Sequence, residues 1–119
     1  MNLSLNIKAM DVAKVVLKHP ATKEVVGTLV VAGPDHEVMK QIRRDAIDRI
    51  QKPGGASNVE EETRKELVAR TLGWEGIKNK DTGEEVAFDA SVLPELYKQF
   101  WLRRQVLEAI NDDGFFYRE

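Results

Sequence analysis

The stretch Gly73-Trp74-Glu75-Gly76-Ile77 places a tryptophan between two glycines and is the most informative part of this sequence. A tight turn at Asp81-Thr82-Gly83 follows it, and then Val86-Ala87-Phe88-Asp89 sets an aromatic residue beside a helix-capping residue. Glycines let the backbone turn sharply or approach another segment closely, and a tryptophan covers a large apolar area. The pattern therefore predicts an irregular docking corner. Trp74 either fills the core there or anchors a partner.

An aromatic helix is expected after this corner. Asp89 or Ser91 can cap its start, Pro94 fits its first turn, and Asn111-Asp112-Asp113-Gly114 ends it. Its broad apolar face contains Val92, Leu93, Leu96, Tyr97, Phe100, Trp101, Val106, Leu107 and Ile110. A face this wide either lies deep in a small core or meets another chain.

Six aromatic residues are the candidate partner-binding residues. They are Trp74, Tyr97, Phe100, Trp101, Phe115 and Phe116. Phe100 is expected to lie on the stripe of the last helix, and Trp101 to extend that stripe sideways. Phe115 and Phe116 follow the helix on a short tail, which either folds back onto the body or faces outward.

The N-terminal third predicts a β-hairpin. Two β-branched runs, at residues 11–18 and 25–31, flank the turn-forming residues 19–24. A two-stranded hairpin alone is marginally stable in water, so this one must pack on the helices or pair with another copy. No internal repeat is visible along the chain.

Two helices are expected between the hairpin and the corner. Residues 35–51 carry an apolar stripe at helical spacing, formed by Val38, Met39, Ile42, Ala46, Ile47 and Ile50. Residues 58–72 follow a capping box that begins at Ser57, and Gly73 suits the position just past a helix end. The expected fold is α+β and mainly α-helical, with an N-terminal hairpin (about 11–32) followed by three to four helices (about 35–111) in a single domain spanning residues 1–119.

The composition of the chain excludes or disfavours several classes of function. The 119 residues contain no cysteine, which excludes disulfides and zinc–thiolate sites, and the net charge of -2 disfavours nucleic-acid binding driven by overall charge. His19 and His36 are the only histidines, and no serine lies in a nucleophile elbow, so neither an enzyme nor a metal or other cofactor is expected. The chain shows no signal peptide and no apolar run of about 20 residues, which indicates a cytoplasmic protein without a membrane segment.

The order of features from residue 73 onward resembles a known family. Gly-Trp-x-Gly-Ile, a turn with glycine, x-Phe-Asp and an apolar helix with Val92, Leu93 and Leu96 look like the C-terminal half of the tail assembly chaperones of long-tailed (siphovirus-type) bacteriophages. The resemblance covers roughly residues 35–119 and is sharpest over residues 73–89. It implies a protein of the infected cell's cytoplasm, absent from the mature virion, that binds the tape-measure protein, keeps it soluble and promotes assembly of the tail tube around it.

The same resemblance implies a second product of the gene. In the family, a programmed ribosomal frameshift near the end makes a longer form whose extension recruits the tail-tube protein, and this chain would be the short form. The codons of Gly114-Phe115-Phe116 are the one place near the C-terminus that could supply a slippery heptamer.

Two further expectations complete the sequence reading. The alternative function is a DNA-binding regulator that uses a helix pair, with Arg43, Arg44 and Arg49 on phosphates, although Asp45 and Asp48 interrupt this basic patch. In either case we expect a homo-oligomer that associates through the hairpin, the last helix or both into an open or ring-like array rather than only a closed dimer.

Overall fold

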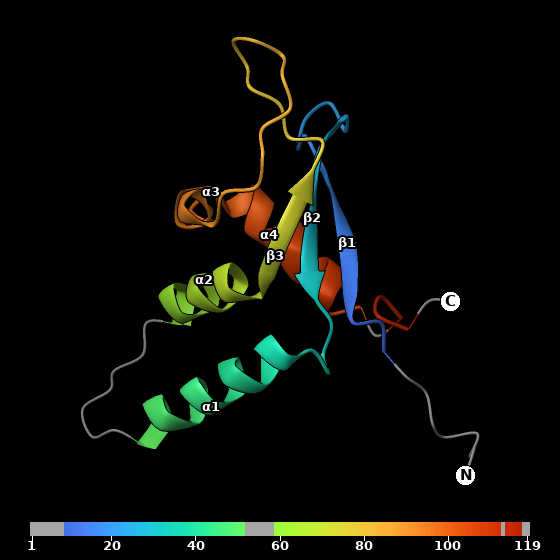
Figure 1. The fold of residues 1–119 in the computed structure, drawn as a ribbon. Helices are drawn as coiled ribbons and strands as arrows, with labels where there is room; N and C mark the ends of the chain where they lie inside the picture. The colour runs from blue at the N-terminus through green and yellow to red at the C-terminus, as the bar shows by residue number, and fades with distance from the viewer. Residues whose placement is uncertain (1–8, 52–58, 113, 118–119) are drawn as a thin grey trace.

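The computed structural model describes residues 9–51, 59–112 and 114–117. Three antiparallel strands form a sheet in the order β1-β2-β3, with bounds β1 Val12–Lys18, β2 Val25–Ala32 and β3 Thr71–Glu75 (Figure 1). The helices are α1 Glu37–Gln51, α2 Val59–Arg70, α3 Leu93–Leu96 and α4 Phe100–Ile110, and a short 3-10 helix, η1 Ala90–Val92, precedes α3.

The expected N-terminal hairpin is confirmed, but the expectation of a mainly helical fold is wrong, because a third strand follows α2 directly. Leu29 of β2 pairs with Trp74, and Val30 pairs with Gly73. The predicted helix over residues 58–72 therefore ends at Arg70, and Gly73 lies in a strand instead of past a helix end. In this segment the left-handed backbone is found at Gly76, whose φ is 68°.

The sheet has one covered face, here called the inner face. Alternation along β1 buries Ala13, Val15 and Leu17 on this face. They form the main core with residues of β2, of the helices α2, α3 and α4, and with the residue that follows α3: Leu29, Val31, Leu67, Leu93, Leu102, Val106 and Tyr97. In Figure 1, α4 runs behind the strands and covers this face.

The expected single long helix over the last third is interrupted at residues 97–99. Gln99, the residue before α4, has an extended backbone with ψ 118°, so α3 and α4 are separate helices. Because a break changes the rotational phase of a helix, residues on its two sides no longer share one stripe. Tyr97 is fully buried, whereas Phe100 is 67% exposed.

A second, smaller core lies where α1 leaves the sheet. Ala32 at the end of β2 is buried against Met39 and Ile42 of α1. The first turn of α1 therefore covers one end of the other sheet face, here called the outer face. From there α1 runs beside α2, away from the strands (Figure 1).

Two hairpin tips carry the same turn. In residues 19–24 and again in residues 79–84, the first N–H donates to the last carbonyl at 2.8 Å, and the first side chain accepts from the third N–H. A threonine at the fourth position accepts from the sixth N–H in both turns. The fifth residue has positive φ in both, 65° for Lys23 and 73° for Gly83. Both tips lie at the same end of the molecule (Figure 1).

A glutamine side chain occupies one end of the edge of β1. Gln105 of α4 donates from Nε2 to the carbonyl of Lys18 at 2.7 Å and accepts from the N–H of Lys18 at 2.8 Å. This pair of bonds is the pattern that a neighbouring strand would make.

Candidate functional site

The predicted docking corner, residues 73–89, is closed by Trp74. Its ring contacts Phe88 edge-on, with centroids 4.9 Å apart, and its Nε1 donates to the carbonyl of Val86 at 2.8 Å. The N–H of Gly76 donates to Oε1 of Glu85 at 2.9 Å. Trp74 is half-buried and packs against the main core. Its principal role is to hold the returning segment against β3.

Asp89 caps the helical region that follows, as the sequence predicted. Its carboxylate accepts from the hydroxyl of Ser91 at 2.7 Å and from the N–H of Ser91 at 3.0 Å. These two bonds lower the pKa of Asp89, the side-chain bond more than the backbone bond. Pro94 lies in the first turn of α3, also as expected.

Tyr97 belongs to the core and offers no surface to a partner. Its hydroxyl oxygen lies 2.6 Å from Oγ1 of Thr71, which in turn donates to the carbonyl of Leu67 at 2.7 Å. Burial raises the pKa of Tyr97 to about 12. Tyr97 was proposed as a partner contact, but it lies at the centre of the packing between α2, α3 and the sheet.

The C-terminal tail folds back onto the body. Phe116 is 4% exposed, and its carbonyl accepts from the N–H of Met10. The guanidinium of Arg70 lies 5.0 Å from the centre of the Phe116 ring, a cation–π distance. Phe115 is half-buried and contacts Phe116 edge-on, with centroids 4.8 Å apart.

Arg70 is an important residue that the sequence reading missed. It is 8% exposed, and its Nε donates to the carbonyl of Ala32 at 2.8 Å. Burial is the main cause that lowers the pKa of Arg70, while Glu66 acts in the opposite direction. Arg70 therefore ties the end of α2 to the end of β2 and to the tail. Its position as the last residue before a strand was not visible while β3 was unrecognised.

Of the six candidate partner-binding residues, Phe100 is the one that faces solvent. It is 67% exposed and has the guanidinium of Arg103 6.0 Å from its ring centre. Trp101 is half-buried against the core, and its Nε1 donates to the side chain of Gln99 at 3.1 Å. The break before α4 thus exposes the first of these two neighbours and partly covers the second.

Arg103 fixes Phe100 beside α2. Its Nη1 donates to the carbonyls of Tyr97 at 2.8 Å and Lys98 at 3.1 Å, which are released from helical bonding by the break. Its Nη2 reaches Oε1 of Glu60, in the first turn of α2, at 2.8 Å. The exposed ring of Phe100 consequently stands close to the start of α2.

A groove of about 340 Å³ runs between α2 and α3 on this side. It is lined by Glu61, Arg64, Lys65, Val68, Ala69, Pro94 and Lys98. Its floor is apolar, and three cations and one carboxylate stand around it. Within the described part of the chain, the Nε atom of Arg64 is buried without a hydrogen-bond partner. The groove and Phe100 together are the candidate binding surface.

Residues 9–51, 59–112, 114–117 contain no group of three or more His, Cys, Asp or Glu that could hold a metal ion. His19 and His36 each accept a backbone N–H through Nδ1. None of the helices in this part of the chain is long and apolar enough to span a bilayer.

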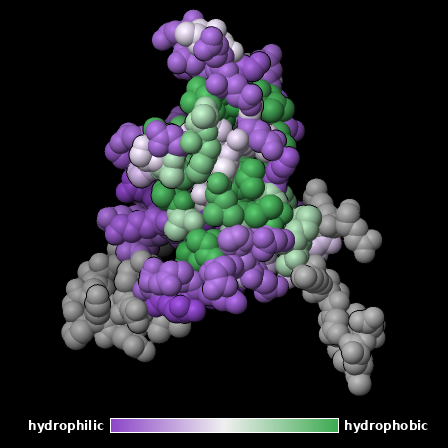
Figure 2. All heavy atoms as spheres, viewed as in Figure 1, coloured by the Kyte–Doolittle hydropathy of each residue, from purple (hydrophilic) through white to green (hydrophobic). Residues whose placement is uncertain are grey.

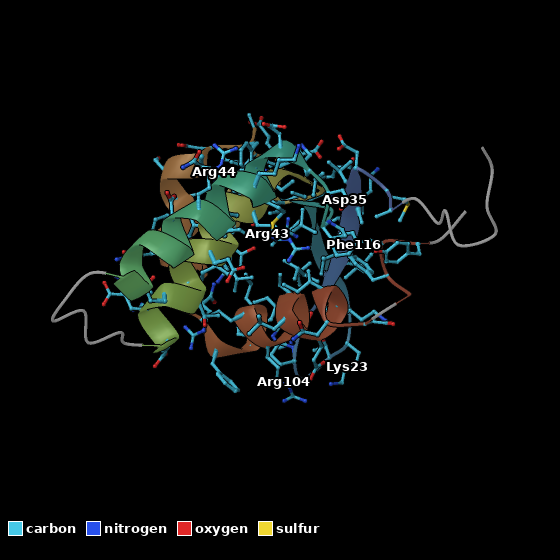
Figure 3. The ribbon with its side chains drawn as sticks, turned by 90° about the horizontal axis from the view of Figure 1, so that it is seen from below. Lys23, Asp35, Arg43, Arg44, Arg104 and Phe116 are labelled. Carbon is cyan, nitrogen blue, oxygen red and sulfur yellow. The ribbon has the colours of Figure 1, made fainter. Side chains whose placement is uncertain are left out.

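The basic residues proposed for DNA do not form one face. Arg43 donates to the carbonyl of Pro34 at 2.8 Å. Seen from below, Arg43 points toward the centre of the view, whereas Arg44 points outward (Figure 3). The side chain of Arg49 lies outside the described residues. No observation therefore favours the regulator.

No protein-family model, curated protein or solved structure matches the chain. The likeness to tail assembly chaperones consequently rests on the sequence pattern of residues 73–89 and the helix that follows. The structure shows in addition how these residues fold.

Proposed function

We propose that this chain is a binding protein without enzymatic activity, a tail assembly chaperone of a siphovirus-type bacteriophage. It binds the tape-measure protein in the infected cell's cytoplasm, keeps it soluble while the tail tube assembles, and leaves before the virion is complete. The observation that carries the proposal is the groove between α2 and α3 with Phe100 beside it. The corner that resembles tail assembly chaperones, residues 73–89, supports this surface. It ends at Asp89, the cap from which η1 and α3 begin.

The groove suits a helical ligand. Its apolar floor, formed by Val68, Ala69 and Pro94, can accept apolar side chains spaced along one helix face. Lys65 and Lys98 at its rim are surface cations that remain 59% and 56% exposed although they pair with nearby glutamates. A tape-measure chain is long and helical by family resemblance, so many copies of a weak groove can act along it together.

The test is co-expression with a helical fragment of the tape-measure protein from the same phage genome. We expect the fragment to become soluble and to co-purify with the wild-type chain. Phe100→Ser should reduce the co-purified amount severalfold, because it removes the exposed ring beside the groove. Tyr117→Ser is the matched control, since Tyr117 is also an exposed aromatic (45%) but lies on the C-terminal tail. Equal recovery with both variants would place the binding surface elsewhere, and no solubilisation by the wild type would refute the function.

A longer form that recruits the tail-tube protein is part of the same proposal. It would arise by -1 slippage at the codons of Gly114-Phe115-Phe116. Phe116 is a core residue in the short form, so the longer form would continue from a segment that is already anchored. Gene sequencing decides the point: a TTC codon for Phe115, or a Gly114 codon that does not end in T, removes this site.

A further inference from the structure

The outer face of the sheet is apolar where polar side chains are usual. An antiparallel sheet with one solvated face normally alternates hydrophobic-in and polar-out. Here Val12 and Val16 point away from the core and are 39% and 49% exposed, and Val30 of β2 is half-buried between the two edge strands. Exposing these β-branched side chains to water is unfavourable, so this face is suited to contact with another apolar surface.

Beyond the end of this face at Ala32, which α1 covers, no described helix lies in front of it. In Figure 1 the strands are nearest the viewer, with α4 behind them and α1 beyond their lower end. Figure 2, in the same orientation, shows a hydrophobic area in the middle of the molecule with hydrophilic side chains around it. The face is therefore open as well as apolar.

A single ion pair spans the face from edge to edge. Nζ of Lys14, on β1, lies 2.9 Å from Oε1 of Glu75, on β3, and the two side chains remain 60% and 54% exposed. Lys14 is opposite Val30, and Glu75 is opposite Thr28, so the two charges flank β2 within two residues of each other along the strands. The two charged groups therefore meet over β2, with the positive one reaching in from the β1 edge and the negative one from the β3 edge.

We propose that this face binds the same face of a second copy of the chain, with a two-fold axis along β2. In that arrangement β1 of each copy lies over β3 of the other, so each Lys14 meets Glu75 of the partner subunit and the β2 strands pack at the centre. Two sheets packed in this way keep aligned strands about 10 Å apart. The charge pattern selects a second copy as the occupant, because it is complementary to itself. The proposal rests on the sheet alone and uses none of the groove residues.

The apolar part of the interface is tested by sedimentation equilibrium of the full chain. We expect the wild type to form a dimer and Val30→Lys to weaken the association at least ~10-fold, because Val30 lies on β2, where the two copies meet at the axis, and the change places two cations together there. Val92→Lys is the matched control, since Val92 is 39% exposed but lies in η1, off the sheet. A wild type that stays monomeric up to high micromolar concentration would overturn the proposal, as would a Val30→Lys dimer of unchanged affinity.

The charged part gives a second test, which does not depend on how Val30→Lys folds. Lys14→Glu makes both edges negative and Glu75→Lys makes both positive, so each variant alone should be a weaker dimer. An equimolar mixture should recover a 1:1 heterodimer, because the two altered faces are complementary to each other. Lys98→Glu and Glu95→Lys, which change an exposed 2.8 Å ion pair elsewhere, are the controls. If the sheet variants and their mixture dimerise equally well, the interface lies on another surface and the proposal fails.

Discussion

The hydroxyl oxygens of Tyr97 and Thr71 lie 2.6 Å apart in the core, and the direction of the bond between them follows from their neighbours. A hydroxyl group has one hydrogen, and Thr71 gives its own to the carbonyl of Leu67. Tyr97 is therefore the donor and Thr71 the acceptor. The bond from Tyr97 to Thr71 joins the end of α3 to the first residue of β3. The bond from Thr71 to Leu67 extends this connection to the last turns of α2.

Tyr97→Phe should lower the free energy of unfolding by about 1–2 kcal/mol, because it removes one buried hydrogen bond and leaves an acceptor without its donor. Urea denaturation followed by circular dichroism measures the change. Tyr117→Phe alters the same chemical group on an exposed tyrosine and should have no measurable effect. If the two variants lost equal stability, the hydroxyl pair would not contribute as described.

The stability of the chain should fall at high pH through Tyr97. Its pKa is raised from 10.0 to about 12 in the folded state, so folding favours the protonated phenol. The stabilisation is fully present below about pH 10 and is lost as the pH rises through 12, by roughly 2–3 kcal/mol. Urea denaturation between pH 9 and about 12 should show a steeper decline for the wild type than for Tyr97→Phe. Parallel curves for the two proteins would contradict the assignment to this residue.

The two tip turns predict opposite effects of a reciprocal pair of substitutions. Lys23 and Gly83 occupy the same turn position with positive φ, where a side chain costs about 1 kcal/mol relative to glycine. Lys23→Gly should therefore stabilise the chain by up to about 1 kcal/mol, and Gly83→Lys should destabilise it by about as much. Thermal unfolding of both variants checks the sign. Two shifts in the same direction would show that the turns are not equivalent.

Arg103 and Arg104 are neighbours with very different expected contributions. The side chain of Arg103 is 12% exposed and binds two carbonyls and Glu60, so Arg103→Ala should cost about 2–3 kcal/mol and loosen the break before α4. Arg104 makes only an exposed helix-surface pair with Glu108, and Arg104→Ala should cost less than about 0.5 kcal/mol. Urea denaturation of both variants tests the difference, and similar losses would remove the special role of Arg103.

The sequence predicted the elements with strong local signals. The β-branched strand β1, the first half of the apolar stripe of α1, the turn at Asp81-Thr82-Gly83 and the cap at Asp89 all depend on near neighbours, and all are present. The second half of the stripe, Ala46, Ile47 and Ile50, has its side chains outside the described residues. β3 was missed because Thr71-Leu72-Gly73-Trp74-Glu75 has no clean alternation. It is a strand because β2 offers it an edge to pair with.

The break before α4 could not be predicted for a similar reason. Residues 97–99 contain neither glycine nor proline, and the carbonyls freed there are satisfied by Arg103, a residue of the next helix. Without the break, Tyr97 and Phe100 were placed on one broad apolar face and both were proposed as partner contacts, whereas the structure buries Tyr97 and exposes Phe100. The repeated turn, by contrast, does have a sequence signature, Lys-x-x-x-Thr-x-Glu at residues 18–24 and 78–84, which the sequence analysis missed.

The two bonds between Gln105 and Lys18 have a consequence for how copies of the chain can meet. An exposed strand edge is a template on which further strands add without limit, which produces fibres. At this end of β1 a side-chain amide already fills the place of the next strand, so an incoming chain finds no free backbone groups at Lys18. Growth along the edge is discouraged there, while contact across the open face remains possible and stops at two copies. A single glutamine thus favours an assembly that closes over one that continues.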